Sequence, residues 1–347
     1  MSDLEGLAAA VASSPEEPGP LLVWADALLA RAEPLGEFIS ASFSLTRETE
    51  AGRFVETRKR AEALLAAHRR SWLGGADVAD EQWRWGLLRR CALRVEPEHL
   101  FQAQMASEDA PLTHLTLLLD ELVRLRSSPA GRFLEGVALQ LPAGLSTLAP
   151  VAAAVAQTPT VHELVLSEPS GARSVRLDAF PTITRWRLLG VPLHPATTLL
   201  PSLERLELLD APLFPGAEDL LAAPAPHLRT LGLGDERLEV ARLLTRLTRA
   251  THPALRRLSI TDDLADDVLL ALADSPLLAQ LDTLEVQGPF TDEGLRAVSD
   301  AAARFDRLQR VSLVGGGVSA SVKKTALKRL PRLEVLGRKP RGSWTGW

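Results

Sequence analysis

A short apolar pattern recurs through the last two thirds of the chain: leucine, two residues, leucine, one residue, leucine, with other apolar side chains allowed. The second and third apolar positions are two residues apart, so on a β-strand they point to one side and the residue between them points to the other. The pattern therefore predicts a series of short strands that each bury one face. The triplets are Leu134-Val137-Leu139, Val161-Leu164-Leu166, Ile183-Trp186-Leu188, Leu203-Leu206-Leu208, Leu228-Leu231-Leu233, Leu255-Leu258-Ile260, Leu281-Leu284-Val286, Leu308-Val311-Leu313 and a truncated Leu333-Leu336.

The triplets return at a nearly constant distance. Their first positions are 20 to 27 residues apart, within the period of about 20 to 29 residues of leucine-rich repeats. Because one strand cannot bury its leucines alone, stacked repeats form a continuous core. We therefore expect an α/β fold, a right-handed leucine-rich-repeat solenoid over residues 87–337, with a parallel sheet on its concave face and helices on its convex face. An ordinary leucine-rich α/β domain is the alternative, but a doubly wound sheet does not keep so constant a period.

Segments with a helical period separate the later strands. Apolar residues recur every three or four positions over 238–250, 265–275 and 292–305, which predicts a helix in each. Thr261 and Thr291 are each followed by acidic residues and are the expected N-caps of the last two helices. The repeats near 183 and 203 are shorter and punctuated by proline, so they have room only for a loop or a single turn.

The turns after the strands depart from the usual repeat pattern. That pattern has Asn or Cys three residues after the last leucine, whereas this chain has Pro, Val, Ala, Glu, Asp or Gly there. Side-chain ladders of asparagine normally satisfy buried backbone groups at this turn. Water or backbone pairing therefore has to replace them.

Residues 1–86 differ from the rest of the chain. They hold 14 acidic and 9 basic residues, so the whole net charge of −5 lies in this quarter. Helical patterns predict helices over 3–13, 20–32 and 36–70, with a break in the last near Gly52. An uncovered end layer of leucines promotes aggregation, so we expect residues 1–86 to form an α-helical capping module. It would abut a first weak repeat strand at Leu88-Cys91-Leu93.

Part of this module resembles a known bacterial family. The run from Trp24 to Ile39 is similar to the repeat-companion domain of myxobacteria and planctomycetes, whose motif runs from tyrosine-alanine-aspartate through an acid-proline pair to glycine-glutamate-phenylalanine-isoleucine. Trp24 stands where that family has Tyr, and Ala27 where it has Trp. Residues 64–69 and 72–74 are similar to its second conserved stretch, and the resemblance covers about residues 15–95. The matching motif residues are Ala25, Asp26, Leu28, Arg31, Pro34, Gly36, Glu37, Phe38 and Ile39.

The resemblance implies a small helical module placed ahead of leucine-rich or similar repeats, and it brings no established chemistry. From the residues alone, Asp26 and Glu37 suggest a carboxylate pair for acid–base catalysis. However, no His and no Ser-rich loop accompanies them. We expect both to brace helix ends instead, through Arg31 or backbone amides.

Most motifs that carry enzymatic chemistry are absent. The sequence has no G-x-G-x-x-G or Walker-type phosphate loop, no G-x-S-x-G turn and no H-E-x-x-H pair, and its single cysteine, Cys91, excludes an internal disulfide. The glycines at 315–317 fit a tight loop better than a phosphate turn. The acidic cluster at 262–267 lacks the spacing of a Ca²⁺ loop and suits the start of a helix. We therefore expect no catalytic residue, no cofactor and no metal.

Charge and hydropathy restrict location and partners. The sequence has no run of eighteen uncharged apolar residues, so it predicts no membrane span. The first residues lack the basic segment of a signal peptide. We therefore expect a cytoplasmic protein with no membrane partner. The net charge of −5 argues against nucleic acid as a partner.

A partner would meet the residues that alternate with the buried ones on the concave face. Arginine there would suit carboxylates, because its planar guanidinium donates two parallel hydrogen bonds. The alternative is a solvated face with Arg–Glu pairs between strands, such as Arg205 with Glu163, or Glu285 with Arg257 or Arg310. The sequence supports both interpretations equally. The candidate partner-binding residues are Glu163, Arg185, Arg187, Arg205, Glu207, Arg257, Glu285 and Arg310.

These features predict a non-enzymatic scaffold or adaptor that binds a protein or peptide partner through the concave face. The alternative is an accessory protein that presents a peptide or client to a partner enzyme of peptide maturation or secretion. Residues 338–347 form a basic tail with Trp344 and Trp347. This tail either recognises a partner, with RNA as a third hypothesis, or folds back over the last repeat; the exposed end of the array favours the cap.

Overall fold

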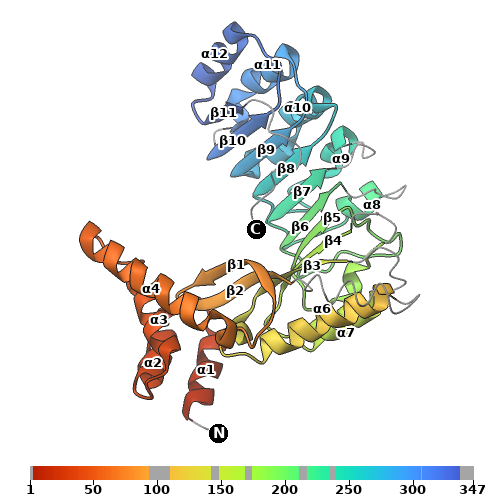
Figure 1. The fold of residues 1–347 in the computed structure, drawn as a ribbon. Helices are drawn as coiled ribbons and strands as arrows, with labels where there is room; N and C mark the ends of the chain where they lie inside the picture. Colours follow the sequence, from red (N-terminus) through yellow and green to blue (C-terminus); the bar gives the residue numbers. More distant parts are fainter. Residues whose placement is uncertain are drawn as a thin grey trace. The chain divides into compact units, whose positions relative to one another are not determined.

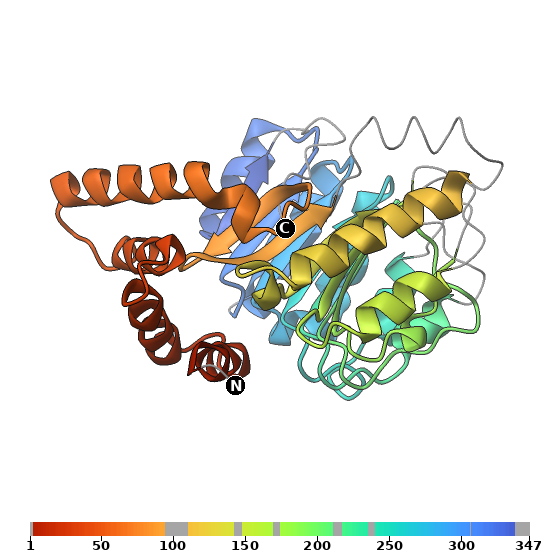
Figure 2. The same cartoon turned by 60° about the horizontal axis from the view of Figure 1, so that its bottom comes forward.

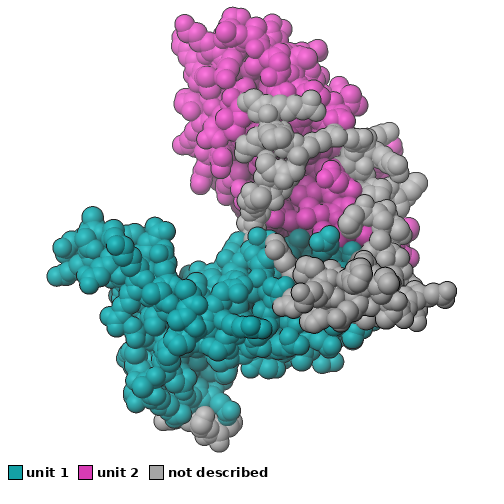
Figure 3. Space-filling model, viewed as in Figure 1, with its two compact units in different colours: residues 1–165 teal, residues 166–347 magenta. Residues whose placement is uncertain are grey.

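The computed structural model describes residues 3–93, 110–141, 148–168, 174–210, 217–234, 240–305 and 307–336. The chain divides into two compact units, residues 1–165 and 166–347 (Figure 3). The strands form an open eleven-stranded sheet, in which strand order follows chain order from β1 to β11. The predicted tail at 338–347 lies outside the described residues. The fold is thus α/β with a long, mostly parallel sheet, as the sequence predicts.

The strands are short and regularly placed along the chain. They are β1 Val78–Arg84, β2 Leu87–Leu93, β3 Gly136–Gln140, β4 Glu163–Ser167, β5 Arg185–Leu189, β6 Arg205–Leu209, β7 Thr230–Gly234, β8 Arg257–Thr261, β9 Thr283–Gln287, β10 Arg310–Val314 and β11 Leu333–Leu336. β2 is the expected first repeat strand, since Cys91 and Leu93 pair with Val137 and Leu139 of β3 in parallel. The triplet pattern therefore locates the strands from β2 to β10 correctly.

Unit 1 begins with four helices, α1 Asp3–Ser13, α2 Pro18–Leu29, α3 Pro34–Ser44 and α4 Ala51–Trp72. They agree with the predicted helices, including the break near Gly52. Prolines occupy the first turns of α2 and α3, where a missing N–H costs nothing. The expected module is not entirely helical, however: β1 forms an antiparallel hairpin with β2 through the turn Trp85-Gly86. Asp80, Glu81 and Gln82 are three consecutive polar residues in β1, so no alternating pattern marked it as a strand.

Aromatic contacts join the N-terminal helices to the rest of unit 1. Phe38 stacks on Trp72 with ring centroids 5.0 Å apart, and Trp24 meets Phe133 edge-on at 5.3 Å. The same apolar cluster includes Leu87 of β2. One core therefore extends across residue 86, where the sequence suggested a domain boundary.

A long helix in unit 1 is missing from the sequence-based expectation. It is α6 Ala110–Arg126, followed by the short η1 Gly131–Phe133 and by α7 Ala149–Ala156. Leu115, Leu118, Leu122 and Leu125 of α6 are buried at helical spacing. Figures 1 and 2 show α6 and α7 lying side by side.

In unit 2 the parallel register aligns the triplets across the sheet. Leu206 and Leu208 of β6 pair with Leu231 and Leu233 of β7, and the alignment continues through β8, β9 and β10. These apolar positions are at most 1% exposed. Each Å² of buried apolar surface contributes about 25 cal/mol to folding. This continuous layer is therefore the main source of stability.

The last repeat differs from its predicted register. Leu333 pairs with Val311, and Val335 pairs with Leu313. The true triplet is therefore Leu330-Leu333-Val335, and the expected Leu333-Leu336 is shifted by three residues. Leu336, which the shifted pattern would bury, is 39% exposed.

Helices of unit 2 lie between the strands. They are η2 Leu177–Ala179, α8 Ala217–Ala222, α9 Val240–Arg246, α10 Ala265–Asp274, η3 Pro276–Gln280, α11 Asp292–Asp300, η4 Ala302–Phe305 and α12 Ala320–Arg329. Figure 1 shows α10, α11 and α12 side by side along one face of β8–β11. As predicted, residues 190–204 after β5 hold no helix, whereas the repeat that starts at β6 contains α8, whose six residues exceed the expected single turn. Thr291 caps α11, but Thr261 lies in β8, and Asp262 accepts from the Leu264 N–H before α10 instead.

Backbone hydrogen bonds replace an asparagine ladder at the turns. Gly288 shows why the turns allow little substitution: its φ is 152°, and a Cβ there would lie 1.8 Å from the Asp262 carbonyl oxygen. At these turns, the N–H of the residue that follows one strand donates to the carbonyl oxygen of the last residue in the next strand. The pairs are Gly190 to Leu209, Asp210 to Gly234, Asp262 to Gln287, Gly288 to Val314 and Gly315 to Leu336.

A second ladder links the starts of successive helices. The Asp266 carboxylate of α10 accepts from the Thr291 N–H at 2.9 Å and from the Thr291 hydroxyl at 2.8 Å. One repeat later, the Asp292 carboxylate of α11 accepts from Ser319 N–H at 2.7 Å and from its hydroxyl at 2.8 Å. Each acidic residue thus fixes the N-cap of the next helix.

A helix that crosses a bilayer needs about 20 predominantly apolar residues. In the part of the chain that the structure describes, no helix is long and apolar enough to do so.

Candidate interaction surface

One face of the sheet in unit 2 carries the side chains that alternate with the buried leucines. We call this face, on strands β5 to β10, the open face. The parallel register arranges its residues in three rows that cross the strands. We call the row nearest the strand starts the basic row, because it holds four arginines and no acidic residue. Its members, from β5 to β10, are Arg185, Arg205, Thr230, Arg257, Thr283 and Arg310.

The next two rows have different chemistry. The middle row mixes charges, hydroxyls and a glycine, whereas the third row carries no charge. The middle row consists of Arg187, Glu207, Gly232, Ser259, Glu285 and Ser312. The third row consists of Leu189, Leu209, Gly234, Thr261, Gln287 and Val314.

Glu207 binds two arginines at once. Arg187 Nε donates to Glu207 Oε2 at 2.6 Å, and Arg205 Nε donates to Oε1 at 2.9 Å. The Arg187 and Glu207 side chains are only 14% and 12% exposed, so water screens this pair less than a surface pair. Gly232 on the neighbouring strand provides the space, since a Cβ there would lie 2.8 Å from Glu207 Cγ.

The outer arginines make weaker pairs. Arg185 Nε lies 3.0 Å from a Glu204 carboxylate oxygen, and Arg310 Nη2 lies 3.2 Å from Glu334 Oε2. All four side chains are substantially accessible to water, so each pair contributes little to stability. A ligand carboxylate could replace either acidic partner at small cost.

Arg257 differs from its neighbours in the basic row. Among the described residues, neither Arg257 nor Glu285 has an ion-pair partner, and Arg257 is exposed. Its neighbours in the row are Thr230 and Thr283, whose side chains are short. The predicted pair between Glu285 and Arg257 or Arg310 is therefore not formed. An exposed guanidinium between two hydroxyl groups is a suitable site for a carboxylate.

Glu163 differs from the accessible side chain that the sequence suggested. It begins β4 in unit 1, its side chain is 5% exposed, and Arg90 Nη2 lies 2.8 Å from its carboxylate. A buried, paired carboxylate braces the sheet and is not a contact for a partner. We therefore remove Glu163 from the candidate residues, which remain Arg185, Arg187, Arg205, Glu207, Arg257, Glu285 and Arg310.

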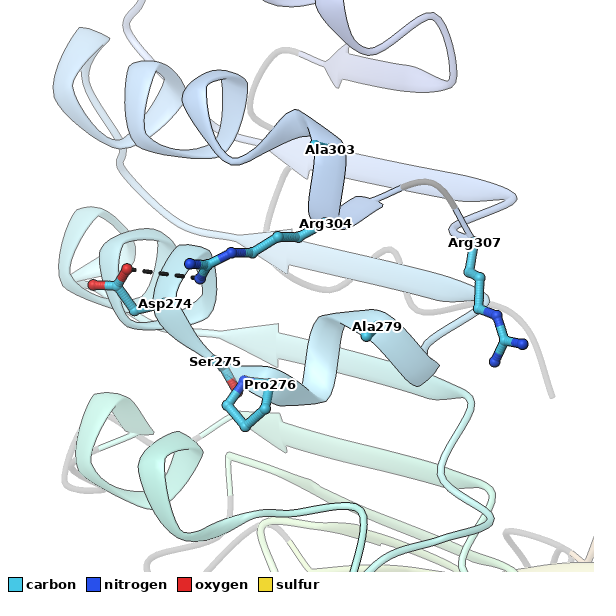
Figure 4. A pocket seen from close by; sticks show the side chains of 7 residues that line it. All are labelled: Asp274, Ser275, Pro276, Ala279, Ala303, Arg304 and Arg307. Atoms are coloured by element: carbon cyan, nitrogen blue, oxygen red, sulfur yellow. Dashed lines mark ion pairs between the residues drawn. The ribbon is translucent and has the colours of Figure 1, made fainter.

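A shallow cavity between η3 and η4 is a second candidate site. Its volume is about 520 Å³. Arg304 points toward Asp274 on one side, with 3.8 Å between guanidinium and carboxylate, and Arg307 lies at the other end (Figure 4). Arg304 also donates to the Ala273 carbonyl oxygen at 2.6 Å, so it joins neighbouring repeats. The lining residues are Asp274, Ser275, Pro276, Ala279, Ala303, Arg304 and Arg307; the carboxylate among them, Asp274, faces Arg304, and no histidine lines the cavity.

The other candidates from the sequence have structural roles. Glu37 pairs with Arg60 of α4 at 2.6 Å rather than with Arg31. The loop at 315–317 is held by backbone bonds, including one from the Gly317 N–H to the Phe290 carbonyl oxygen. Burial raises the pKa of the Cys91 thiol, which keeps it protonated and unreactive. Over the described ranges, no group of three His, Cys, Asp or Glu residues could hold a metal ion.

Comparison with known proteins adds information on the fold. No family model and no curated protein matches this chain. The chain is similar to the crystal structure of a Bacteroides fragilis protein that was a target of the Northeast Structural Genomics Consortium. The two share 19% sequence identity, with a TM-score of 0.52, over 84% of this chain and 86% of that one. At this identity the likeness concerns the fold alone.

Proposed function

We propose that this chain is a non-enzymatic interaction protein, a leucine-rich-repeat array that binds a protein or peptide partner through its open face. The basic row carries the proposal. Four arginines and no acid occupy one register of the sheet, and exposed Arg257 has no ion-pair partner among the described residues. Arg185 lies directly beside Arg205, and each has a glutamate partner, Glu204 and Glu207. The charge of Arg257 has no such partner in the described ranges and is the one that a bound anion would compensate.

Two features support the repeat assignment. The apolar triplets return at 20 to 27 residues before the last repeat, within the period of the leucine-rich class. The turns at Gly190, Asp210, Asp262, Gly288 and Gly315 are each tied to the next repeat by the same backbone hydrogen bond, which is what stacked equivalent units require. The N-terminal helices share their core with β2 and so cover one end of the array, as a repeat-companion module would.

The middle row favours a protein partner over nucleic acid. Glu207 and Glu285 lie one register step from the arginines. A polynucleotide carries a charge at every phosphate and would meet these carboxylates as well as the basic row. A polypeptide can place single carboxylates on the arginines and uncharged groups beside the glutamates. The proposal includes a cytoplasmic location in a bacterium, as expected from the sequence.

Capture of partners from native lysate tests the proposal. The variant is R185E with R257E, because both side chains are accessible, whereas reversal of Arg187 or Arg205 would crowd carboxylates around Glu207. The control is R296E with K324E, which makes the same change of charge on exposed positions of α11 and α12. We expect the double variant on the open face to lose at least nine tenths of its captured partners, as quantified by mass spectrometry, and the control to lose none.

Circular dichroism must show that both variants are folded. Equal capture by wild type and by R185E/R257E would contradict the proposal, because the partner would then bind elsewhere on the chain.

A further inference from the structure

The spacing of arginines in the basic row indicates the conformation of the bound segment; this inference rests on the proposed function. Arg205, Arg257 and Arg310 belong to β6, β8 and β10, so one strand separates each from the next. The two intervening strands place Thr230 and Thr283 in the same row. From β6 to β10, arginine therefore recurs at every second strand of the row, and Arg185 on β5 lies outside this alternation.

This spacing can be compared with regular ligand conformations. Neighbouring strands lie about 4.8 Å apart, so successive arginines start about 9.6 Å apart. A polyproline II segment rises about 3.1 Å per residue with three residues per turn, which places every third side chain on one side at about 9.3 Å. The mismatch over two steps is roughly 0.6 Å, small for a side chain as long as arginine.

Other ligand conformations match less well. A β-strand places every second side chain on one side, about 6.7 Å apart, and turns every third one away. An α-helix returns to the same side after seven residues, about 10.5 Å, and accumulates roughly 1.8 Å of mismatch over two steps. The polyproline II geometry therefore fits the row best.

The residues between the arginines suit the backbone of such a ligand. Polyproline II has no internal hydrogen bonds, so its carbonyl oxygens need donors from water or from the protein. Thr230 and Thr283 carry hydroxyl donors between the three arginines, and Ser259 of the middle row adds another beside Arg257. The row therefore alternates groups for carboxylates with groups for carbonyl oxygens.

We infer that the basic row binds an acidic polypeptide segment in polyproline II conformation, laid across β6 to β10, with a carboxylate at every third residue. Arg257 and Arg310 each take one carboxylate, and the third carboxylate lies over Arg205, whose guanidinium stays bonded to Glu207. The exposed pair between Arg310 and Glu334 opens to accept the ligand, and the two threonines bind its backbone.

Binding of synthetic peptides to the full chain tests this inference. The probe is three repeats of Glu-Pro-Pro. Its matched control has the same composition with its three Glu residues at alternate positions, and a Lys-Pro-Pro repeat controls for charge. Calorimetry at low and physiological salt should show the first peptide binding at least tenfold more tightly than the alternate-position peptide, and no binding of the lysine peptide.

Protein variants then locate the site. R257Q should weaken the spaced peptide about tenfold, whereas R296Q, on an exposed helix position, should leave its affinity unchanged. Both substitutions are at exposed sites and are expected to keep the fold, which circular dichroism checks.

Each other outcome overturns the inference in a distinct way. Equal affinity for both glutamate peptides, still weakened by R257Q, would reject the spacing but keep the open face as the binding surface. Binding that R257Q does not change would reject the row itself. Tighter binding of polyuridylate than of the spaced peptide would assign the row to nucleic acid. Absence of any peptide binding would reject the acidic ligand, while the lysate experiment would decide the proposed function separately.

Discussion

His252 is fully buried in the loop that leads into β8. Its Nδ1 lies 2.9 Å from the Thr251 hydroxyl, and its carbonyl oxygen accepts from Gln280 Nε2 at 2.9 Å. Burial lowers the pKa of the imidazole below its ordinary value of 6.5. The side chain therefore fills the core as a neutral group and links two successive repeats.

This burial predicts a pH dependence of stability. Above pH 6.5 the imidazole is neutral in the folded and in the unfolded chain, so it does not make the free energy of unfolding depend on pH. As the pH falls below 6.5, the unfolded chain binds a proton that the folded chain does not, so the free energy of unfolding falls by up to about 1.4 kcal/mol per pH unit until the folded pKa is reached. In urea unfolding between pH 7.5 and 5, we expect H252Q to lose less stability than the wild type.

The exposed His227 provides the control. H227Q should retain the wild-type pH slope. A wild-type slope in H252Q would show that His252 does not stay neutral in the folded chain.

The sequence predicted which side chains lie on the open face better than it predicted which of them pair with each other. Alternation with leucine correctly placed Arg187 and Glu207 on one face, because strand geometry alone decides that. It could not show that Glu207 binds two arginines, since this depends on side-chain torsions and on the space left by Gly232. Nor could it show that Arg90, from a strand far earlier in the chain, buries Glu163.

At the scale of elements, the apolar period located strands better than it located helices. Two apolar residues two positions apart are enough to locate a strand. The positions predicted in this way agree with β2 to β10. The last strand shifted by three residues because Leu330, Leu333 and Leu336 all fit a leucine pattern, and only pairing with β10 selects among them. α6 did carry a recognisable signal, its buried leucines at helical spacing, whereas the polar β1 carried none.

The hydrogen bonds of Asp266 with Thr291 and of Asp292 with Ser319, which link successive helices, predict that loss of one carboxylate destabilises the next helix. Ser319 hydrogen bonds lower the pKa of the Asp292 carboxyl, so this group stabilises the fold above its unfolded pKa and loses that effect as the pH falls. D292A removes the acceptor that fixes the N-cap of α12. We expect faster amide hydrogen exchange across Ala320–Arg329 and a lower Tm.

Glu293 allows a matched comparison, since it is an exposed acidic residue in the same first turn of α11. E293A should change neither measurement, because the dipole effect of an exposed charge is small. Equal exchange rates in α12 for D292A and E293A would mean that the ladder does not hold the helix.

At the scale of the whole molecule, the N-terminal helices and the first repeat strand of unit 1 depend on one core. Trp24, Phe38 and Trp72 share it with Leu87 and Phe133. Compositional change suggested a boundary near residue 86, but charge reports only on the surface. The contact of Trp24 with Phe133 joins residues far apart in sequence, which no local pattern reveals.

Truncation tests this dependence. A chain of residues 87–347 would expose Leu87 and Phe133, so we expect it to aggregate in size-exclusion chromatography and to bind a hydrophobic dye. In the full chain, W24A should lower the free energy of unfolding by about 3 to 5 kcal/mol, as loss of a buried aromatic does. V23A, at the neighbouring position with a 54% exposed side chain, should change it little. A monomeric, cooperatively folded 87–347 chain would show that the helices are dispensable.

The agreement between spatial order and chain order has a consequence for biosynthesis. Each new strand leaving the ribosome finds its partner already made, directly upstream, so the sheet can grow by one strand at a time without waiting for distant segments. The reverse also holds. A protease or a molecular motor pulling on the C-terminal end would peel off β11 first and then its predecessors, one step per repeat, rather than meeting a single large mechanical barrier.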